Sequence, residues 1–378
     1  IHPLRIADFK LERFFAAHEF SVRYLLSASD CEALTQAELL ALADAATLAL
    51  WHDLKLGYTE SAGHPLLRVA VAALYAGIAA EEVLVAAPEE LIFIAMNVLL
   101  AAGDHVIVTY PGYQSLYEVA HALGAEVTRW MLRPTADGWQ LDLDELEQSI
   151  TPRTRLLVIN FPHNPTGFLP PRPELDAILD IARRHDLYIF SDEMYRLLEY
   201  NAADRLPSVA DLYERGIALS GLSKAFGLPG LRIGWLATHD RAFLARAAAF
   251  KDYTTICNSA PSEILGLIAV TARDEILTRN LRIVQDNLAL AGAFFARFAD
   301  RFCWLPPRAG SVAFPQLRPA VPVADFCRDV LAKRDLLILP GDVFDYAGNH
   351  FRVGLGRRNF GEALAVLEGY LTAEAQPS

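Results

Sequence analysis

The chain has 378 residues, 53% of them hydrophobic and 21% charged, a composition typical of a globular protein with a substantial core. Its 34 Lys and Arg residues stand against 46 Asp and Glu residues, and the net charge of −12 argues against a surface for nucleic acid or anionic membrane. No apolar run approaches the roughly 20 residues of a membrane span, and no HExxH or CxxC spacing occurs, so we expect no membrane span, no metal site, no disulfide framework and a cytoplasmic location.

The first half of the chain alternates between predicted helices and strands. Thr35-Gln-Ala-Glu38 is a capping box, which predicts an amphipathic helix running toward Leu50. Pro65 begins a second helix, which Gly77 ends. Short β-branched runs then predict strands near 83–85 and at 105–109, 126–131, 155–159, 187–190 and 217–219, with helices at 113–123, 143–150 and 171–185. This alternation indicates an α/β protein with a mainly parallel sheet that helices cover on both faces.

The last hundred residues have a different pattern. A long helix is predicted from about 275 to 299, followed by a Pro-rich turn at 305–310 and a helix near 324–333. Strands at 336–339 and 351–354 and a final helix to about Thr372 complete the chain. We therefore expect an N-terminal segment, 1–40, that packs beside a small α+β domain, 286–378, and a large domain at 41–285.

Four of the predicted strands are each followed by residues that could carry chemistry. Tyr113 follows the strand at 105–109, Asn164 the strand at 155–159, Asp192 and Tyr195 the strand at 187–190, and Lys224 the strand at 217–219. Ligands of open parallel sheets bind beyond the carboxyl ends of the strands, so these groups should meet at one edge. A lysine that forms an imine, a carboxylate that keeps a pyridine nitrogen protonated and an aromatic ring that stacks on it are what a pyridoxal cofactor requires.

Three motifs then place the chain beside a known family. The stretch Gly221-Leu-Ser-Lys-Ala-Phe-Gly-Leu-Pro-Gly-Leu-Arg-Ile-Gly234 resembles the lysine signature of the class I/II aminotransferases of the type I pyridoxal-phosphate fold. Asn160-Phe-Pro-His-Asn-Pro-Thr-Gly167 and Ser191-Asp-Glu-Met-Tyr195 are similar to two further motifs of that family. The resemblance extends from about Tyr58 to Arg352. It implies a mainly parallel seven-stranded sheet, a smaller α+β domain and pyridoxal 5′-phosphate as cofactor.

The resemblance also implies a role for each residue that contacts the ring of the cofactor. Lys224 would form the Schiff base and later move the proton at the α-carbon of the substrate, work for which its pKa must be lowered. Asp192 would pair with the pyridinium nitrogen. Asn164 and Tyr195 would contact the 3-oxygen, and Tyr113 would stack on the ring.

Other residues would bind the phosphate and the substrate. Ser223 and Arg232 would hold the phosphate, and Tyr58 would reach the phosphate of a neighbouring subunit in a homodimer with shared active sites. Arg352 would bind the substrate α-carboxylate through two hydrogen bonds, with Arg357 and Arg358 as competitors for this role. His64, His163, Tyr253 and Asn258 are weaker candidates for contact with the substrate.

Two positions depart from the family pattern, and both concern the phosphate. The family has a small hydroxyl residue, a glycine and a small residue where this chain has Ala86-Ala87-Pro88. Pro88 fits a first helical position but has no N–H to donate. Gly221 stands where Ser or Thr is common. We expect a weaker hold on the phosphate at Ala87 and Pro88.

The same residues serve more than one reaction of an amino acid. Lys224, Asp192 and Arg352 are needed both for transamination with a 2-oxo acid and for loss of a β-substituent. The segments that begin at Pro111 and Lys251 are similar to those of the capreomycidine synthase branch, which cyclises a hydroxylated arginine. We expect an aminotransferase, with a β-eliminating lyase or cyclase as the alternative. A ligand sensor on the same fold is disfavoured, because the residues before 36 leave no room for a DNA-binding module.

Overall fold

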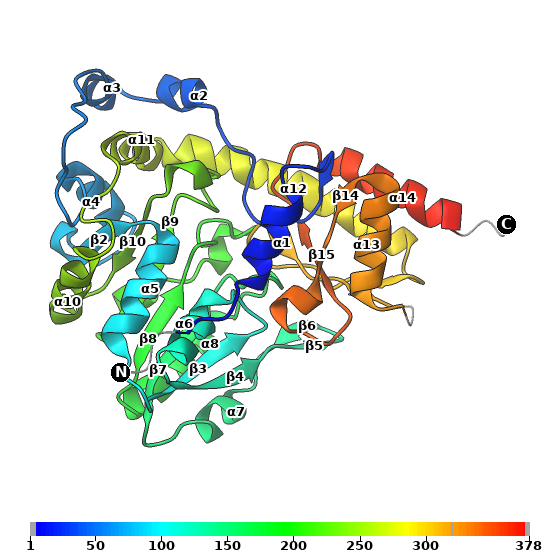
Figure 1. The fold of residues 1–378 in the computed structure, drawn as a ribbon, viewed down its shortest axis with the longest axis horizontal. Coiled ribbons are helices and arrows are strands. Elements are labelled where there is room, and N and C mark those ends of the chain that lie inside the picture. The colour runs from blue at the N-terminus through cyan, green and yellow to red at the C-terminus, as the bar shows by residue number, and fades with distance from the viewer. Residues whose placement is uncertain (1–4, 319–320, 375–378) are drawn as a thin grey trace.

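A computed structural model describes residues 5–318 and 321–374, and its centre is a seven-stranded sheet (Figure 1). The strand order is β2-β10-β9-β8-β7-β3-β4, and every neighbouring pair is parallel except the two that include β10. The bounds are β2 Val83–Ala86, β3 His105–Tyr110, β4 Glu126–Met131, β7 Thr154–Asn160, β8 Tyr188–Asp192, β9 Gly216–Gly221 and β10 Gly234–Ala237. The predicted α/β fold with a mainly parallel seven-stranded sheet is confirmed. Only the antiparallel β10 was missed.

The sheet is buried because helices that lie between its strands in the sequence pack against it. Every residue of β2, β3 and β10 is buried, as expected for strands covered on both faces. The helices of this part are α4 Pro65–Ala72, α5 Pro88–Leu99, α6 Ser115–Ala122, α7 Leu143–Gln148, α8 Arg172–Arg184, α9 Val209–Leu212, α10 Arg241–Lys251 and α11 Ala260–Thr271. None of the helices in residues 5–318 and 321–374 combines the length and apolar character needed to cross a bilayer.

The capping box at Thr35 begins a shorter helix than predicted. The side chain of Thr35 accepts a hydrogen bond from the Glu38 amide, and the Glu38 carboxylate accepts one from the Thr35 amide, so the box itself is confirmed. The helix, α2, covers only Gln36–Ala41. The prediction of one helix toward Leu50 was wrong, because Asp44 caps a second helix, α3 Ala45–His52, through a 2.7 Å bond from the Thr47 amide to its carboxylate.

The C-terminal part follows one long helix, α12 Arg273–Arg297. Small sheets and two helices come after it: β11 Phe302–Cys303, β12 Val312–Ala313, β13 Gln316–Leu317, α13 Val323–Arg334, β14 Leu336–Leu337, β15 Leu339–Pro340, β16 Phe351–Gly354 and α14 Phe360–Glu374. The strand predicted at 336–339 is two strands, because β14 and β15 belong to different sheets. The three domain boundaries remain predictions.

The N-terminal segment joins the two parts of the molecule. It contains α1 Lys10–His18 and β1 Tyr24–Leu25, and β1 pairs in parallel with β14. In Figure 1, α1 lies in dark blue between the large sheet and the C-terminal elements. The amide of Lys10 donates a 2.9 Å hydrogen bond to the side chain of Gln114, just before α6. Residues 9–30 therefore run past the carboxyl edge of the large sheet. Elsewhere in the chain, β5 Arg133–Thr135 and β6 Gly138–Gln140 form a separate hairpin.

Candidate active site

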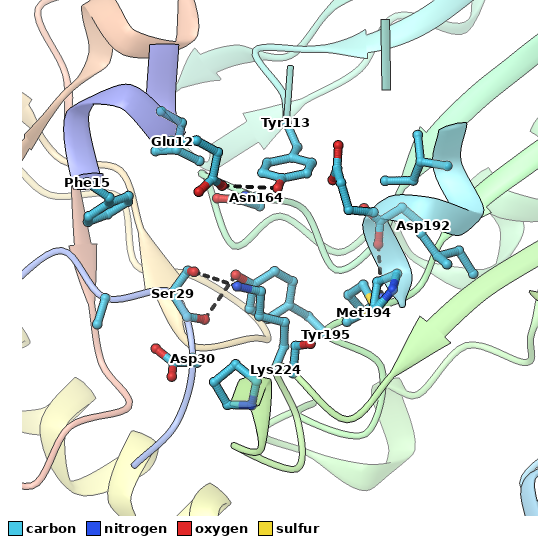
Figure 2. Close-up of a pocket in the computed structure, with 18 of the residues that line it drawn as sticks. Glu12, Phe15, Ser29, Asp30, Tyr113, Asn164, Asp192, Met194, Tyr195 and Lys224 are labelled. Carbon is cyan, nitrogen blue, oxygen red and sulfur yellow. Dashed lines mark hydrogen bonds between the residues drawn. The ribbon is translucent and has the colours of Figure 1, made fainter. Parts of the chain in front are cut away.

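A cavity of about 400 Å³ lies beyond the carboxyl ends of β3, β7, β8 and β9. This is the position where open parallel sheets bind ligands, at the point where the chain order of the strands reverses between β7 and β3. Nine of the eleven residues predicted for the site line the cavity, namely Pro88, Tyr113, Asn164, Asp192, Tyr195, Ser223, Lys224, Arg232 and Arg352. Figure 2 shows several of them pointing toward one another from different elements.

Lys224 reaches the cavity from the loop that follows β9. Its Nζ donates a 2.7 Å hydrogen bond to the hydroxyl of Ser29 (Figure 2). Burial lowers the pKa of Lys224, because the ammonium form loses its hydration there. The nearby carboxylate of Asp30 opposes this shift, and the guanidinium of Arg352 adds to it. A lysine in this setting is easier to deprotonate than a surface lysine, as an amine nucleophile requires.

Asp192 is the last residue of β8 and is almost completely buried. Its carboxylate accepts a 3.0 Å hydrogen bond from the amide of Met194. Burial raises the pKa of Asp192 to about 7, while that hydrogen bond and the charge of Lys224 act against the shift. Within the part of the chain that the structure describes, no Lys, Arg or His forms an ion pair with Asp192 within 4.0 Å. A cationic group placed beside it would therefore be strongly favoured.

Arg352 lies in the middle of β16 and is fully buried. Its Nη2 donates to the carbonyl of Ser27 at 2.9 Å, and its Nη1 donates to the side-chain oxygen of Asn164 at 3.2 Å. Burial lowers the pKa of Arg352, but a guanidinium keeps its charge in a protein. These contacts fix a planar cation at the cavity wall, where it can bind a carboxylate. Arg357, a predicted competitor, instead pairs with Asp30 at 2.9 Å and does not line the cavity.

Two phenols face the cavity with their hydroxyl groups bonded to the N-terminal segment. Tyr195 donates to the carbonyl of Ser29 at 3.0 Å, and Tyr113 donates to the carboxylate of Glu12 at 3.2 Å (Figure 2). Burial raises the pKa of both phenols, so each remains a hydrogen-bond donor at neutral pH. Tyr113 also packs against Phe9, with ring centroids 4.9 Å apart.

The end of the cavity predicted to bind a phosphate is formed by the first turn of α5 and the loop after β9. Arg232 is exposed, adopts a left-handed conformation with φ of 55°, and donates to the carbonyl of Pro229 at 2.8 Å. Pro88 is the first residue of α5, and Ala87 precedes it without a side-chain cap. Ala87 itself does not line the cavity. Glu89 does, and burial raises the pKa of its carboxyl group, which favours the uncharged form beside an anion.

The sequence patterns missed one wall of the cavity. Glu12 and Phe15 come from α1, Glu19 directly follows this helix, and Ser29 and Asp30 come from the loop after β1. Their local sequence contains no motif, and they reach the site through long-range contacts such as the pairing of β1 with β14 and the hydrogen bond between Glu12 and Tyr113. A carboxylate-bearing helix was not predicted at this position.

Five other candidates lie outside the cavity. Tyr58 and Tyr253 are 91% and 92% exposed. The side chain of Asn258 donates to the carbonyl of Val85 at 3.1 Å, which is a structural contact. His64 accepts a hydrogen bond from the amide of Leu66 at the start of α4. The buried ring of His163 shares a 2.8 Å hydrogen bond with Thr166, and His163 does not line the cavity either.

Comparisons with known proteins agree with the fold and the cavity. A family model described as aminotransferase class I and II matches residues 24–361. Capreomycidine synthase from Streptomyces vinaceus is 31% identical over 99% of this chain and 96% of its own length. The crystal structure of a PLP-dependent aminotransferase from Streptococcus suis gives a TM-score of 0.92 at 30% identity, covering 99% of this chain and 100% of that chain. The PLP-dependent cyclase OrfR gives 0.89 at 29% identity, covering 99% of each chain.

Fold, cavity and relatives together define a pyridoxal-phosphate-dependent enzyme of fold type I. The chain belongs to the class I and II aminotransferase family, and its cofactor is pyridoxal 5′-phosphate. The resemblance seen in the three motifs is thereby confirmed. Members of this family act on amino acids and keto acids, which are small-molecule substrates, and the relatives include both transaminases and a cyclase.

Proposed function

We propose that this protein is an aminotransferase that moves an amino group between an L-amino acid and a 2-oxo acid. One observation carries the proposal: Lys224, from the loop after β9, Asp192, from β8, and Arg352, from β16, line the same cavity. These are an amine, an acid and a guanidinium, the three groups that such a reaction needs in one place. When bound, pyridoxal 5′-phosphate supplies an aldehyde that forms an imine with an amine and a ring that accepts the electrons of the substrate's α-carbon.

The residues present fit this cofactor. Asp192 is a buried carboxylate without a cationic partner among the described residues, and a protonated pyridine nitrogen would provide one. Asn164 and Tyr195 offer donors for the 3-oxygen, and Tyr113 offers a ring for stacking. Ser223 and Arg232 would bind the phosphate, with less help than usual from the Ala87–Pro88 turn, since Pro88 has no N–H.

The roles of the chain's own residues then follow from their positions. Arg352 binds the α-carboxylate of the substrate and orients its α-carbon toward Lys224. The amine of Lys224 takes the proton from that carbon and returns it, and the lowered pKa makes the amine available as a base. Asp192 holds the proton on the ring nitrogen of the cofactor.

A second copy of the chain completes the proposal. Tyr58 and Leu56 are exposed, and so are Tyr253 and Ile256. Hydrogen bonds from Thr59 to the carbonyl of Asn258 and from Ser61 to Asp252 hold these two segments together. Such exposed apolar side chains are typical of a surface that another chain covers. We propose a homodimer in which Tyr58 reaches the phosphate of the neighbouring subunit. The proposed location is the cytoplasm, which suits four free cysteines.

The experiment that tests this function uses the purified protein with pyridoxal 5′-phosphate. The wild type should show a visible absorbance band that Lys224→Ala abolishes. Incubation of the wild type with single amino acids and 2-oxoglutarate should produce glutamate. Absence of the band would contradict the cofactor role of Lys224, and absence of glutamate with every donor would contradict transamination.

One observation favours a second candidate, a β-eliminating lyase or cyclase. Three carboxylates of the N-terminal segment, Glu12, Glu19 and Asp30, line the cavity and suit a substrate with a cationic side chain. Capreomycidine synthase and the cyclase OrfR, both similar over 99% of this chain, are not named as transaminases. The two candidates are separated by product: loss of water from a β-hydroxylated arginine, with no glutamate from any donor, would identify the lyase.

A further inference from the structure

Ser29 lies closest to the chemistry among the residues that the motifs missed. Its hydroxyl accepts the 2.7 Å hydrogen bond from Nζ of Lys224 (Figure 2). Its carbonyl accepts hydrogen bonds from Tyr195 at 3.0 Å and from the hydroxyl of Ser311 at 2.7 Å. The backbone at Ser29 is therefore anchored from two sides, which keeps the hydroxyl beside the amine.

A hydroxyl suits this position in both protonation states of the lysine. It accepts a hydrogen bond from an ammonium group and donates one to a neutral amine. The amine of a lysine stands at the end of a flexible four-carbon side chain, so a free amine without a hydrogen-bond partner samples many positions. Since the hydrogen bond from an ammonium group is charge-assisted, it is about twice as strong as a neutral one.

The other charged groups that face Lys224 are already engaged or do not contact it. They are Glu12, Glu19, Asp30 and Asp192, which favour the ammonium form, and Arg352, which opposes it. Glu12 accepts the hydroxyl of Tyr113, and Asp30 is paired with Arg357 at 2.9 Å and 3.1 Å. Ser29 therefore makes the direct contact, and the carboxylates act on Lys224 only through their field.

We propose that Ser29 is a positioning residue that holds the free amine of Lys224 beside the α-carbon of the substrate. The inference rests on the proposed cofactor role of Lys224. In the step concerned, the C–H bond of the α-carbon breaks and its proton joins the lone pair of Nζ. The cofactor that Lys224, Asp192 and Arg232 would hold would supply the acceptor for the electron pair of the broken bond. An amine held in place is oriented for proton transfer in a larger fraction of the bound complexes, so the transfer is faster.

The test compares Ser29→Ala with Ser21→Ala, a matched change in the same N-terminal segment. Ser21 is exposed and lies outside the cavity, and its hydroxyl donates a 2.9 Å hydrogen bond to the carbonyl of His18, so its removal leaves the cavity wall unchanged. Ser29→Thr keeps the hydroxyl, and Ser29→Val removes it at nearly the same shape. This second pair keeps the comparison informative if Ser29→Ala folds poorly.

Two measurements are made on these variants. In the cofactor-free protein, trace acetylation of Lys224 by acetic anhydride, followed by mass spectrometry across pH, gives the pKa of the amine. Ser29→Ala and Ser29→Val should lower this pKa by about one unit, because the ammonium form loses its acceptor. In the enzyme with cofactor, exchange of the substrate α-hydrogen with deuterated solvent should slow about tenfold, with little change in the substrate concentration for half-maximal rate.

Ser21→Ala and Ser29→Thr should match the wild type in both measurements. The inference is overturned if Ser29→Ala and Ser21→Ala give the same pKa and the same exchange rate, or if Val and Thr at position 29 behave alike. A wild-type protein without a Lys224-dependent absorbance band would instead overturn the proposed function, which distinguishes the two failures.

Discussion

Gly221 and Gly234 face each other across β9 and β10 so closely that a Cβ added to Gly221 would lie 2.9 Å from the Cα of Gly234. It would also lie 3.0 Å from the carbonyl oxygen of Ile233 and 3.2 Å from Cγ of Pro88. A Cβ on Gly234 would lie 2.7 Å from the same Pro88 carbon. The two departures from the family pattern, Gly221 and Pro88, are therefore parts of one packing arrangement at the phosphate end of the cavity.

Gly221→Ser should fail to restore a phosphate contact. The new side chain meets backbone atoms closer than 3.0 Å, so the strands must move, at a cost of about 1–3 kcal/mol in the free energy of unfolding. Urea unfolding measures this loss, and titration with pyridoxal 5′-phosphate should show equal or weaker binding. Gly369→Ser, at an exposed helical position with no atom within 4 Å of the added Cβ, is the control. Tighter binding in Gly221→Ser would contradict the packing argument.

Asp192→Asn should change how the stability of the cofactor-free protein depends on pH. Burial raises the pKa of Asp192 from an ordinary 3.8 to about 7, so the folded state binds its proton more tightly than the unfolded state. The free energy of unfolding therefore falls as pH rises from about 4 to about 7. Asparagine has no proton to lose, so the variant should gain up to about 4 kcal/mol over the wild type at pH 8. Parallel curves in urea unfolding from pH 5 to pH 8 would contradict the assignment.

With the cofactor bound, the same Asp192→Asn variant should lose activity. An amide cannot balance a protonated ring nitrogen, so kcat should fall by about 100-fold or more. If Asp192→Asn makes the protein more stable without the cofactor and less active with it, the carboxylate of Asp192 serves cofactor binding and not the stability of the fold.

Arg352→Lys should raise KM for the amino acid substrate by about 10- to 100-fold. Lysine cannot form two parallel hydrogen bonds with a carboxylate, and hydrogen bonds to charged groups contribute about 1.5–3 kcal/mol. Steady-state kinetics with one donor and varied concentration measures the effect. Arg358→Lys, at an exposed position next to the competitor Arg357, should leave KM unchanged. If the two variants behave alike, Arg352 does not bind the carboxylate.

Mixing Tyr58→Phe with Lys224→Ala should produce hybrid dimers with one complete site. In the hybrid, the subunit that keeps Lys224 receives an intact Tyr58 from its neighbour. Activity of the mixture after joint refolding should exceed the sum for the two separate variants at a limiting concentration of cofactor. A protein that sediments as a monomer, or activities that simply add, would contradict the shared site.

The strands and the motif residues were predictable because their signals are local. Lys224, Asp192 and Asn164 follow buried β-branched strands, and parallel strands bring their carboxyl ends to one edge whatever the rest of the chain does. The single antiparallel strand, Gly234–Ala237, was missed because it directly follows the lysine motif and has no separate pattern. The break between α2 and α3 was missed because its one local signal is Asp44, the N-cap of α3.

The N-terminal wall of the cavity could not be predicted from local sequence. Ser29 and Asp30 reach the site because a two-residue strand, Tyr24–Leu25, pairs with residues more than 300 positions away. Glu12 depends on the packing of α1 beside the hydroxyl of Tyr113. Such contacts follow from tertiary structure alone, and so does the packing of Pro88 on Gly221 and Gly234.

The pairing of Tyr24–Leu25 with Leu336–Leu337 sets the order in which the site can form during synthesis. The ribosome makes the N-terminal strand first, but its partner emerges only when the chain is nearly finished. Until then, the large sheet can fold with Lys224 and Asp192 in place, while one wall of their cavity is missing. A nascent chain that stops before residue 336 therefore has the residues proposed to contact the cofactor ring but lacks Arg352 and the strand with which Tyr24–Leu25 pairs.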